Sequence, residues 1–419
     1  MPLLAHPRFH GWRIVAFCGI SQFMAMGFSI YLLSLYIEPM ATTFNVSPGL
    51  IGSGMGLFYL VTSLSGPLVG SWVDRGHMRT VIMGGTVMFA LSFVAMAFAT
   101  SVWHVALACA ILLAPGVCMI GVLPCAAMLV NWFEKRQAFA LGVAALGISF
   151  GGFFAPPLAA YLITTMGWQQ SMLVFAAIIL VVLLPLSWAL VVGKPAELNQ
   201  YPDGLEPAVT ADAAGQAGAK NGSMRELVSD KTFWYLTLAV GLLSLCSILL
   251  VTYIVPMARE RGVSTELSAL LISAYAASSL TGKFLLGWLG DKFEKRSVFL
   301  LIQLLAVAGW LPMLLLDGIV ALMASVVLVG LAVGGLTPIW GSLIAYYFGA
   351  GAFGRVKGAM TLAMLVCTVV PGPLGGLIYS LYGSYATSFW LLWIALPVAL
   401  LCTWMLPRQG IAARQPAMA

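Results

Sequence analysis

Long apolar runs restrict what this chain can fold into more than any other feature. Twelve of them reach about 20 residues, the length that an α-helix needs to cross the hydrocarbon core of a bilayer. Only 8% of the residues are charged, against about a quarter in soluble domains. We therefore expect an all-α membrane protein with twelve transmembrane helices. The spans are predicted at 12–39, 48–73, 80–100, 102–132, 137–165, 169–193, 232–258, 266–290, 297–316, 319–348, 356–382 and 386–406.

A long polar segment separates the sixth run from the seventh. Residues 194–231 are rich in Ala, Gly, Pro and charged residues, which is typical of a linker. We predict an N-terminal six-helix bundle at 1–193 and a C-terminal bundle at 232–419. Seventeen of the 20 Lys and Arg then fall on the same side of the membrane as both termini. The positive-inside rule makes that side cytoplasmic, and we expect a multi-pass protein of a cell membrane of the bacterial inner-membrane type.

The two predicted halves carry matching segments in the same order. GSWVDRGHMR at 70–79 matches GWLGDKFEKR at 287–296, with a glycine, then an aspartate, then basic residues at equal spacing. EPMATTFNVS at 38–47 matches VPMARERGVS at 255–264, and the two members of this pair are as far apart in the chain as those of the first pair. The halves are therefore interpreted as pseudo-symmetric repeats, the architecture of carriers that work by alternating access around a site near the bilayer midplane.

The repeated loop signature, G-x-x-x-D-[RK]-x-x-x-R, resembles that of the major facilitator superfamily. The opening GWRIVAF…GFSIYLLSLY at 11–36 and TGKFLLGWLGD in the eighth span resemble a narrower branch, the monocarboxylate transporters and oxalate:formate antiporters. The resemblance implies a secondary transporter of a small organic anion, in which a cation of helix 8 binds the substrate carboxylate. Lys283 holds that position, four residues before Gly287.

Three positions depart from the pattern of that branch. Ser34 stands where the animal monocarboxylate carriers have a lysine of helix 1, and Ser279 stands where they have an aspartate of helix 8. The oxalate carriers have a second cation within helix 11, where this chain has only Lys357, which we expect at the cytoplasmic mouth. The lysine and the aspartate belong to the proton-coupling scheme of the animal carriers. The second cation belongs to the binding of a dicarboxylate by two cations.

Lys283 is a charged residue inside an apolar run. It lies eight residues before Asp291, so about 12 Å from that end of the helix at 1.5 Å per residue. A lysine at the centre of a membrane helix costs about 2.5–3.5 kcal/mol on insertion scales. All 14 acidic residues fall in loops or at helix ends, so a bound anion is the predicted partner. The alternative is a structural lysine that bonds backbone carbonyls or reaches the aqueous cavity.

Further candidate substrate-binding residues follow from helix register and from the resemblance. Tyr275, Ser279 and Lys283 recur every four residues on one face of the eighth span. In the superfamily, helices 1, 4, 7 and 10 line the cavity, which adds residues of those spans. An aromatic residue in a membrane helix equally fits packing or an interfacial position. The candidates are Lys283, Tyr31, Ser34, Ser279, Tyr275, Cys125, Tyr253, Thr337 and Trp340.

The loop signatures supply a second set of candidates, with a conformational role. In the superfamily, networks of such aspartates and basic residues hold the cytoplasmic side closed in one state. The alternative is that these charged residues only set the membrane topology and are solvated by water. The predicted gating residues are Asp74, Arg75, Arg79, Asp291, Lys292 and Arg296.

The sequence shows no catalytic constellation, no metal-type spacing of its seven cysteines and no cofactor motif. We therefore expect no enzymatic activity, no cofactor, no metal and no nucleic-acid partner. The predicted partners are a small carboxylate, protons and the lipid bilayer, and we expect a monomer. Proton symport is the first expectation and anion exchange the second. An exporter of drugs or other hydrophobic compounds is a hypothesis of a different class.

Overall fold

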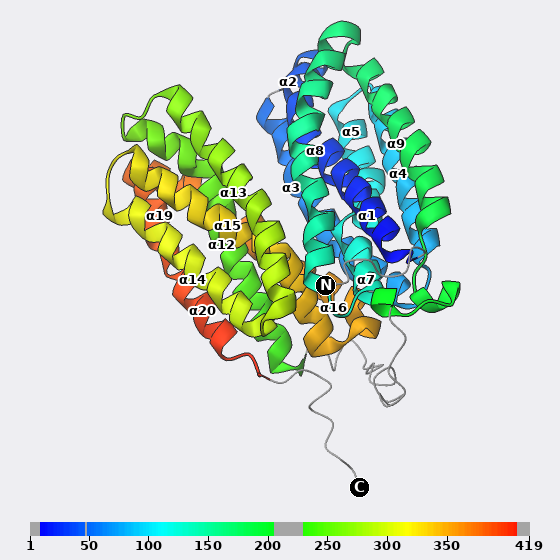
Figure 1. Cartoon of the computed structure of the whole chain (residues 1–419). Helices are drawn as coiled ribbons and strands as arrows, with labels where there is room; N and C mark the ends of the chain where they lie inside the picture. The colour runs from blue at the N-terminus through cyan, green and yellow to red at the C-terminus, as the bar shows by residue number, and fades with distance from the viewer. Residues whose placement is uncertain (1–8, 47, 205–228, 409–419) are drawn as a thin grey trace. The chain divides into compact units, whose positions relative to one another are not determined.

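The computed structural model describes residues 9–46, 48–204 and 229–408, and every regular element within them is helical (Figure 1). Eleven helical stretches of this part are long and apolar enough to cross a membrane. The eleventh predicted span is divided into three consecutive helices, α16 (Phe353–Ala363), α17 (Leu365–Val369) and α18 (Pro371–Tyr382). The predicted all-α membrane architecture is confirmed, and the eleventh predicted span is the one that these three shorter helices occupy.

The chain divides into two compact units by its contacts. Unit 1 is Met1–Asn221 with Phe348–Leu362, and unit 2 is Gly222–Tyr347 with Ala363–Ala419. The predicted bundles joined by a linker at 194–231 stay a prediction, because most of that linker lies outside the described residues. The first eleven elements of unit 1 are α1 (Gly11–Met26), η1 (Gly27–Tyr31), α2 (Leu32–Phe44), α3 (Pro48–Asp74), α4 (Met78–Ala97), α5 (Val102–Ala108), η2 (Cys109–Leu113), α6 (Ala114–Ile120), α7 (Val122–Trp132), α8 (Gln137–Met166) and α9 (Trp168–Leu190).

Unit 2 combines the long helices α12 to α15 with shorter helices toward its C-terminal end. Its α12 begins after Asp230, whose carboxylate accepts the backbone N–H of Thr232 at 2.8 Å and so caps the helix. The remaining elements of this part of the chain are α12 (Lys231–Glu260), α13 (Thr265–Lys292), α14 (Lys295–Leu315), α15 (Ile319–Phe348), α19 (Tyr385–Trp393) and α20 (Ala395–Trp404).

Two turns of unit 1 are π-helical. The element η1 interrupts the first span and η2 interrupts the fourth. A π-turn inserts one extra residue per turn, widens the helix and redirects the side chains that follow, and such turns are frequent at functional sites. Tyr31, a predicted site residue, is the last residue of η1.

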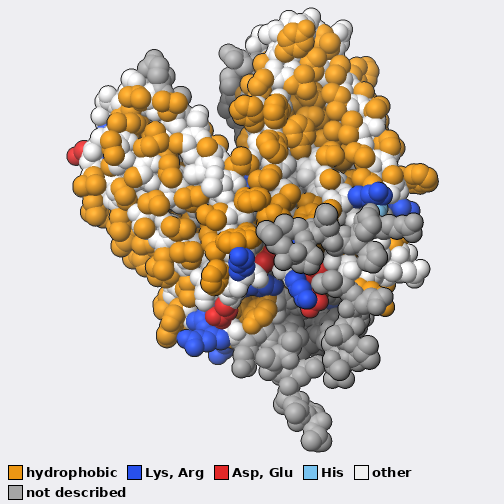
Figure 2. Space-filling view, in the orientation of Figure 1, with side chains coloured by type: hydrophobic (Ala, Val, Ile, Leu, Met, Phe, Trp, Pro, Cys, Tyr) orange, Lys and Arg blue, Asp and Glu red, His pale blue; other side chains and the backbone are white. Residues whose placement is uncertain are grey.

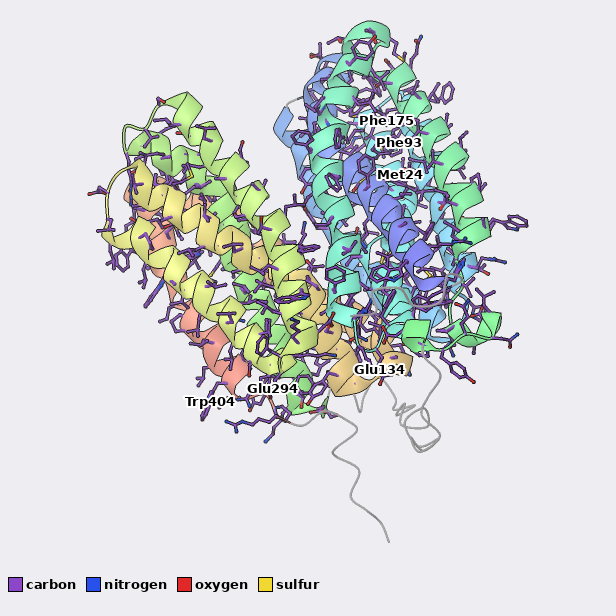
Figure 3. All side chains as sticks on the ribbon, in the orientation of Figure 1. Met24, Phe93, Glu134, Phe175, Glu294 and Trp404 are labelled. Carbon is purple, nitrogen blue, oxygen red and sulfur yellow. The ribbon has the colours of Figure 1, made fainter. Side chains whose placement is uncertain are left out.

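Glycine contacts and aromatic side chains form the core of unit 1. A Cβ added at Gly147 of α8 would collide with the backbone oxygen of Gly19 of α1, so the two helices cross at backbone contact. Phe93 on α4 and Phe175 on α9 are fully buried, with ring centroids 6.3 Å apart (Figure 3). Small residues set the close crossings, and large aromatic residues fill the space beside them.

The outer surface of each unit is apolar. Hydrophobic side chains cover most of the face seen in Figure 2, and most of the basic and acidic side chains visible there lie toward one end of each unit. Phe98, Trp103 and Phe153 are each more than two-thirds exposed. A soluble protein rarely exposes such a continuous apolar surface, whereas a protein surrounded by lipid requires one.

A short described part of the predicted linker is anchored to unit 1. It contains the 3-10 turns η3 (Pro195–Leu198) and η4 (Pro202–Gly204). In η4, Asp203 accepts the backbone N–H groups of Glu134 and Lys135 at 3.0 and 2.6 Å. These donors lie in the loop between α7 and α8, so one carboxylate ties the linker to that loop.

Replacing Asp203 by alanine is expected to lower the free energy of unfolding by about 1–2 kcal/mol, because two backbone donors lose a charged acceptor. The decrease is measured as a lower melting temperature in detergent. Asp203→Asn is the control, since it keeps one acceptor oxygen and tolerates the positive φ of 57° at this position. An alanine variant that melts with the parent would contradict the role of this carboxylate.

Candidate functional site

Lys283 lies within α13, and only 7% of its surface is exposed. The helix α15 crosses α13 at this level. A Cβ added at Gly334 would lie 2.9 Å from the backbone nitrogen of Lys283 and would collide with the carbonyl oxygen of Ser279. Glycine at 334 therefore permits an approach that no larger residue allows, and α15 packs directly beside the lysine.

The structure brings most of the predicted residues of unit 2 to these two helices. Ser279 is 9% exposed and Tyr275 is half-buried. The carbonyl oxygen of Tyr275 would lie 2.7 Å from a Cβ at Gly330, which extends the contact of α13 with α15 by one turn. Thr337 follows Gly334 by three residues on α15, so it lies close to the same helix face.

Two other predicted residues of unit 2 are only partly buried. Trp340 lies further along α15 and is half-buried. Tyr253 on α12 is also half-buried, and its ring stacks on Tyr385 with centroids 5.2 Å apart at 27°. Tyr385 in turn stacks on Tyr379 at 4.1 Å. The Tyr253 ring thus belongs to a cluster of three tyrosines, and its role in substrate binding stays a prediction.

The predicted substrate-binding residues of unit 1 differ in their accessibility. Tyr31 is 40% exposed, and its ring covers Gly152 of α8. The backbone of Ser34 belongs to α2, but its side chain lies outside the described part of the structure. Cys125 on α7 is fully buried, and its backbone oxygen accepts a hydrogen bond from the Cys18 thiol at 3.8 Å. Tyr31 is therefore the one of these three side chains with a described surface open to a solute.

The loop aspartate of unit 1 has a defined set of partners. The Asp74 carboxylate accepts the backbone N–H groups of Gly354 and Arg355 at 2.8 and 2.9 Å. It also pairs with the Arg355 guanidinium, with Nε 3.2 Å from Oδ2. Only 6% of the Asp74 side chain is exposed. The carboxylate thus caps the beginning of α16, where unpaired N–H groups and the helix dipole favour an anion.

Two pairs of glycines hold α3 and α16 together beside this cap. A Cβ at Gly70 would collide with the backbone oxygen of Gly354. One turn away, a Cβ at Gly66 would lie 3.2 Å from the oxygen of Gly358. The two helices therefore touch through their backbones over one turn, which brings the start of α16 within reach of Asp74.

The other predicted gating residues make separate contacts. Arg75 is exposed, and Arg79 donates from Nη2 to the backbone oxygen of Trp188 at 2.8 Å. In unit 2 Asp291 is half-buried and Lys292 places its ammonium 3.8 Å from the centre of the Trp288 ring. Arg296 is 8% exposed and donates to the backbone oxygen of Trp404, a residue labelled in Figure 3. The two repeated loops therefore have different environments despite their matching sequences.

Sequence reasoning missed the partner of Asp74 and the glycine contact beside it. Arg355 is one of the 17 basic residues that the positive-inside rule places on the cytoplasmic side, and no local pattern links it to Asp74. The contact was nevertheless present as a pattern, because Gly66 and Gly70 are spaced as G-x-x-x-G, and so are Gly354 and Gly358. The sequence cannot pair the two motifs, since about two thirds of the chain lies between them.

Lys357 lies deeper than expected. Instead of standing at an aqueous mouth, it is 3% exposed and belongs to α16 within unit 1. Its ammonium lies 5.4 Å from the centre of the Phe353 ring, one turn earlier on the same helix. The structure therefore holds two buried lysines in its described part, Lys283 in unit 2 and Lys357 in unit 1.

Comparison with known proteins agrees with a transporter fold. A "Monocarboxylate transporter 12" of Rattus norvegicus is 25% identical over 407 residues, covering 90% of this chain and 82% of that protein. An "MFS-type transporter" of Gibberella moniliformis is 26% identical over 384 residues, covering 90% and 85%. The resemblance to the monocarboxylate transporter branch that the motifs indicated is confirmed at this level.

A solved structure and a family profile extend the comparison. The proton:xylose symporter XylE, at 17% identity, superposes with a TM-score of 0.76 over 96% of this chain and 98% of that one. This likeness concerns the fold alone. The profile described as the Major Facilitator Superfamily matches residues 17–271 and 238–417. With its helical architecture, its repeated loop signature and this match over nearly its whole length, the chain belongs to the Major Facilitator Superfamily.

Proposed function

We propose that this transporter moves a small organic anion, a monocarboxylate, by alternating access and that Lys283 binds the carboxylate. The observation that carries the proposal is the burial of the Lys283 side chain in α13 against Gly334 of α15. Relatives named monocarboxylate transporters at about a quarter identity support the substrate class.

The physical argument starts from the cost of a buried ammonium. An ionised group in an apolar environment is stable only with a counter-charge or a set of hydrogen bonds. A carboxylate on the substrate supplies a full opposite charge and a charge-assisted hydrogen bond. The lysine then favours anions over neutral analogues, because a neutral analogue adds no opposite charge beside the ammonium.

The neighbours of Lys283 suit the rest of such a substrate. Ser279 and Thr337 offer hydroxyl groups, and Tyr275 offers an aromatic ring with a polar end. Pockets for small ligands combine an apolar wall with a few polar groups that set orientation. A short carboxylic acid with an apolar body matches this combination.

The contact of the Asp74 carboxylate with Gly354 and Arg355 is proposed to stabilise one conformational state of the transport cycle. It combines an ion pair, two helix-capping hydrogen bonds and a glycine contact. Proton symport is the proposed energy source, and anion exchange is the alternative. Both use the same carboxylate site and differ only in what moves with the substrate.

Uptake into proteoliposomes tests the proposal. With an inward proton gradient we expect accumulation of radiolabelled short-chain monocarboxylates, and none of their uncharged amides. Collapse of the gradient with a protonophore should abolish accumulation if protons are co-transported, while preloaded carboxylate should restore uptake in an exchanger. Transport of hydrophobic cations without any carboxylate uptake would refute the proposal and favour an exporter.

A further inference from the structure

An apolar groove of about 720 Å³ lies on unit 1, along the line where α1, α8 and α9 meet. The apolar face of unit 1 in Figure 2 covers these helices, which can be located in Figure 1. Ile20 and Phe150 on the two sides of the groove are 37% and 46% exposed. The groove therefore opens to the surroundings of unit 1. Its wall includes Ala16, Gly19, Ile20, Val143, Phe150 and Val182.

The two main walls of the groove begin at the same end. The helices α1 and α8 cross at backbone contact through Gly19 and Gly147. Near their first residues, the ring of Trp12 lies 6.2 Å from that of Phe139. The helices are thus neighbours from their N-termini to the crossing, and they run in the same direction.

An arginine stands at this end of each wall. Arg13 is exposed and lies three and seven residues before Ala16 and Ile20, which places it on the same face of α1. Arg136 is half-buried and is the N-cap residue of α8, directly before Gln137, so it stands at the first end of the helix whose Val143 lines the groove. Two positive charges, together with the N-terminal ends of two helices, therefore lie where the apolar groove ends.

We propose that this groove binds an anionic phospholipid, with an acyl chain along the apolar wall and the phosphate between Arg13 and Arg136. The argument is one of complementarity. The groove offers an apolar channel that ends in positive charge, and an anionic phospholipid is an apolar chain that ends in negative charge. Basic residues at the ends of membrane helices recognise such headgroups. The site is separate from Lys283, which belongs to unit 2.

Native mass spectrometry tests the proposal on the full chain in detergent, with phosphatidylglycerol and phosphatidylcholine of identical acyl chains as competing probes. The wild-type protein should retain phosphatidylglycerol preferentially. Arg13→Gln and Arg136→Gln should each weaken this retention about fivefold, and the double variant about 30-fold, from the usual contribution of a basic residue near a lipid surface. Arg13→Lys with Arg136→Lys should keep the preference, because both charges remain.

The matched control is Arg408→Gln, which removes an exposed arginine after α20 in unit 2 and should change nothing. Ala16→Phe fills the groove without removing a charge, and it should lower the retention of both lipids. On the wild-type protein alone, raising the salt concentration should weaken the preference for phosphatidylglycerol, because salt screens exposed charges. A double glutamine variant that retains phosphatidylglycerol as the control does, or a preference insensitive to salt, would overturn the proposal.

Discussion

Lys283→Gln is expected to reduce carboxylate uptake by on the order of 100-fold or more. Removing one member of a buried, hydrogen-bonded charge pair costs about 2–5 kcal/mol, and each 1.4 kcal/mol is about a factor of ten. Glutamine keeps most of the side-chain volume and a hydrogen-bond donor, but it has no charge to offer the substrate. Initial uptake rates in proteoliposomes measure the loss, and proton uptake driven by the carboxylate should disappear with it.

Two further variants separate a binding role from a structural one. Lys283→Arg keeps the positive charge and should keep part of the uptake. Lys231→Gln removes an exposed lysine at the start of α12 and should transport like the parent. The Lys283→Gln protein should remain folded, since a neutral side chain is less costly to bury, and its melting temperature shows this. Undiminished uptake by a folded Lys283→Gln protein would exclude the lysine from the carboxylate site.

Gly70→Val is expected to have a comparably large effect, on stability as well as on transport. The new side chain would meet the backbone of Gly354, which cannot yield as a flexible side chain can. Overpacking typically costs about 1–3 kcal/mol. Separation of α3 from α16 would also remove the Asp74 cap and ion pair, at about 1–3 kcal/mol more. We expect a melting temperature lower by several degrees and uptake reduced at least tenfold.

The same helix supplies a matched control. Gly54 lies on α3 as well, and a Cβ there would meet no atom within 4 Å. Gly54→Val changes helix propensity as Gly70→Val does, but it leaves the backbone contact intact. If both variants lose the same stability and the same transport activity, the loss comes from the helix itself, and the contact of α3 with α16 does not hold this part of unit 1 together.

Several elements of the fold followed from local patterns. The predicted first, second and fifth spans overlap helices that end at Phe44, Asp74 and Met166. Lys283 was singled out because its charge interrupts an apolar run, and no tertiary information was needed for that. The loop signature likewise singled out Asp74, whose carboxylate caps α16 in the structure. These signals depend on neighbours in the sequence, whose spacing a helix converts directly into space.

The sequence by itself determined that the chain is a helical membrane protein of two repeats, because hydrocarbon demands long apolar helices and a repeat is visible in the order of residues. It also determined that Lys283 is a charged residue inside an apolar run. Only the tertiary structure decided which helices touch: that Gly334 lies against Ser279 and Lys283, and that Asp74 caps α16 beside Gly70 and Gly354. Such contacts join residues far apart in the chain. They depend on which small residues face each other, and periodicity reports the face of a helix but not the partner that packs on it.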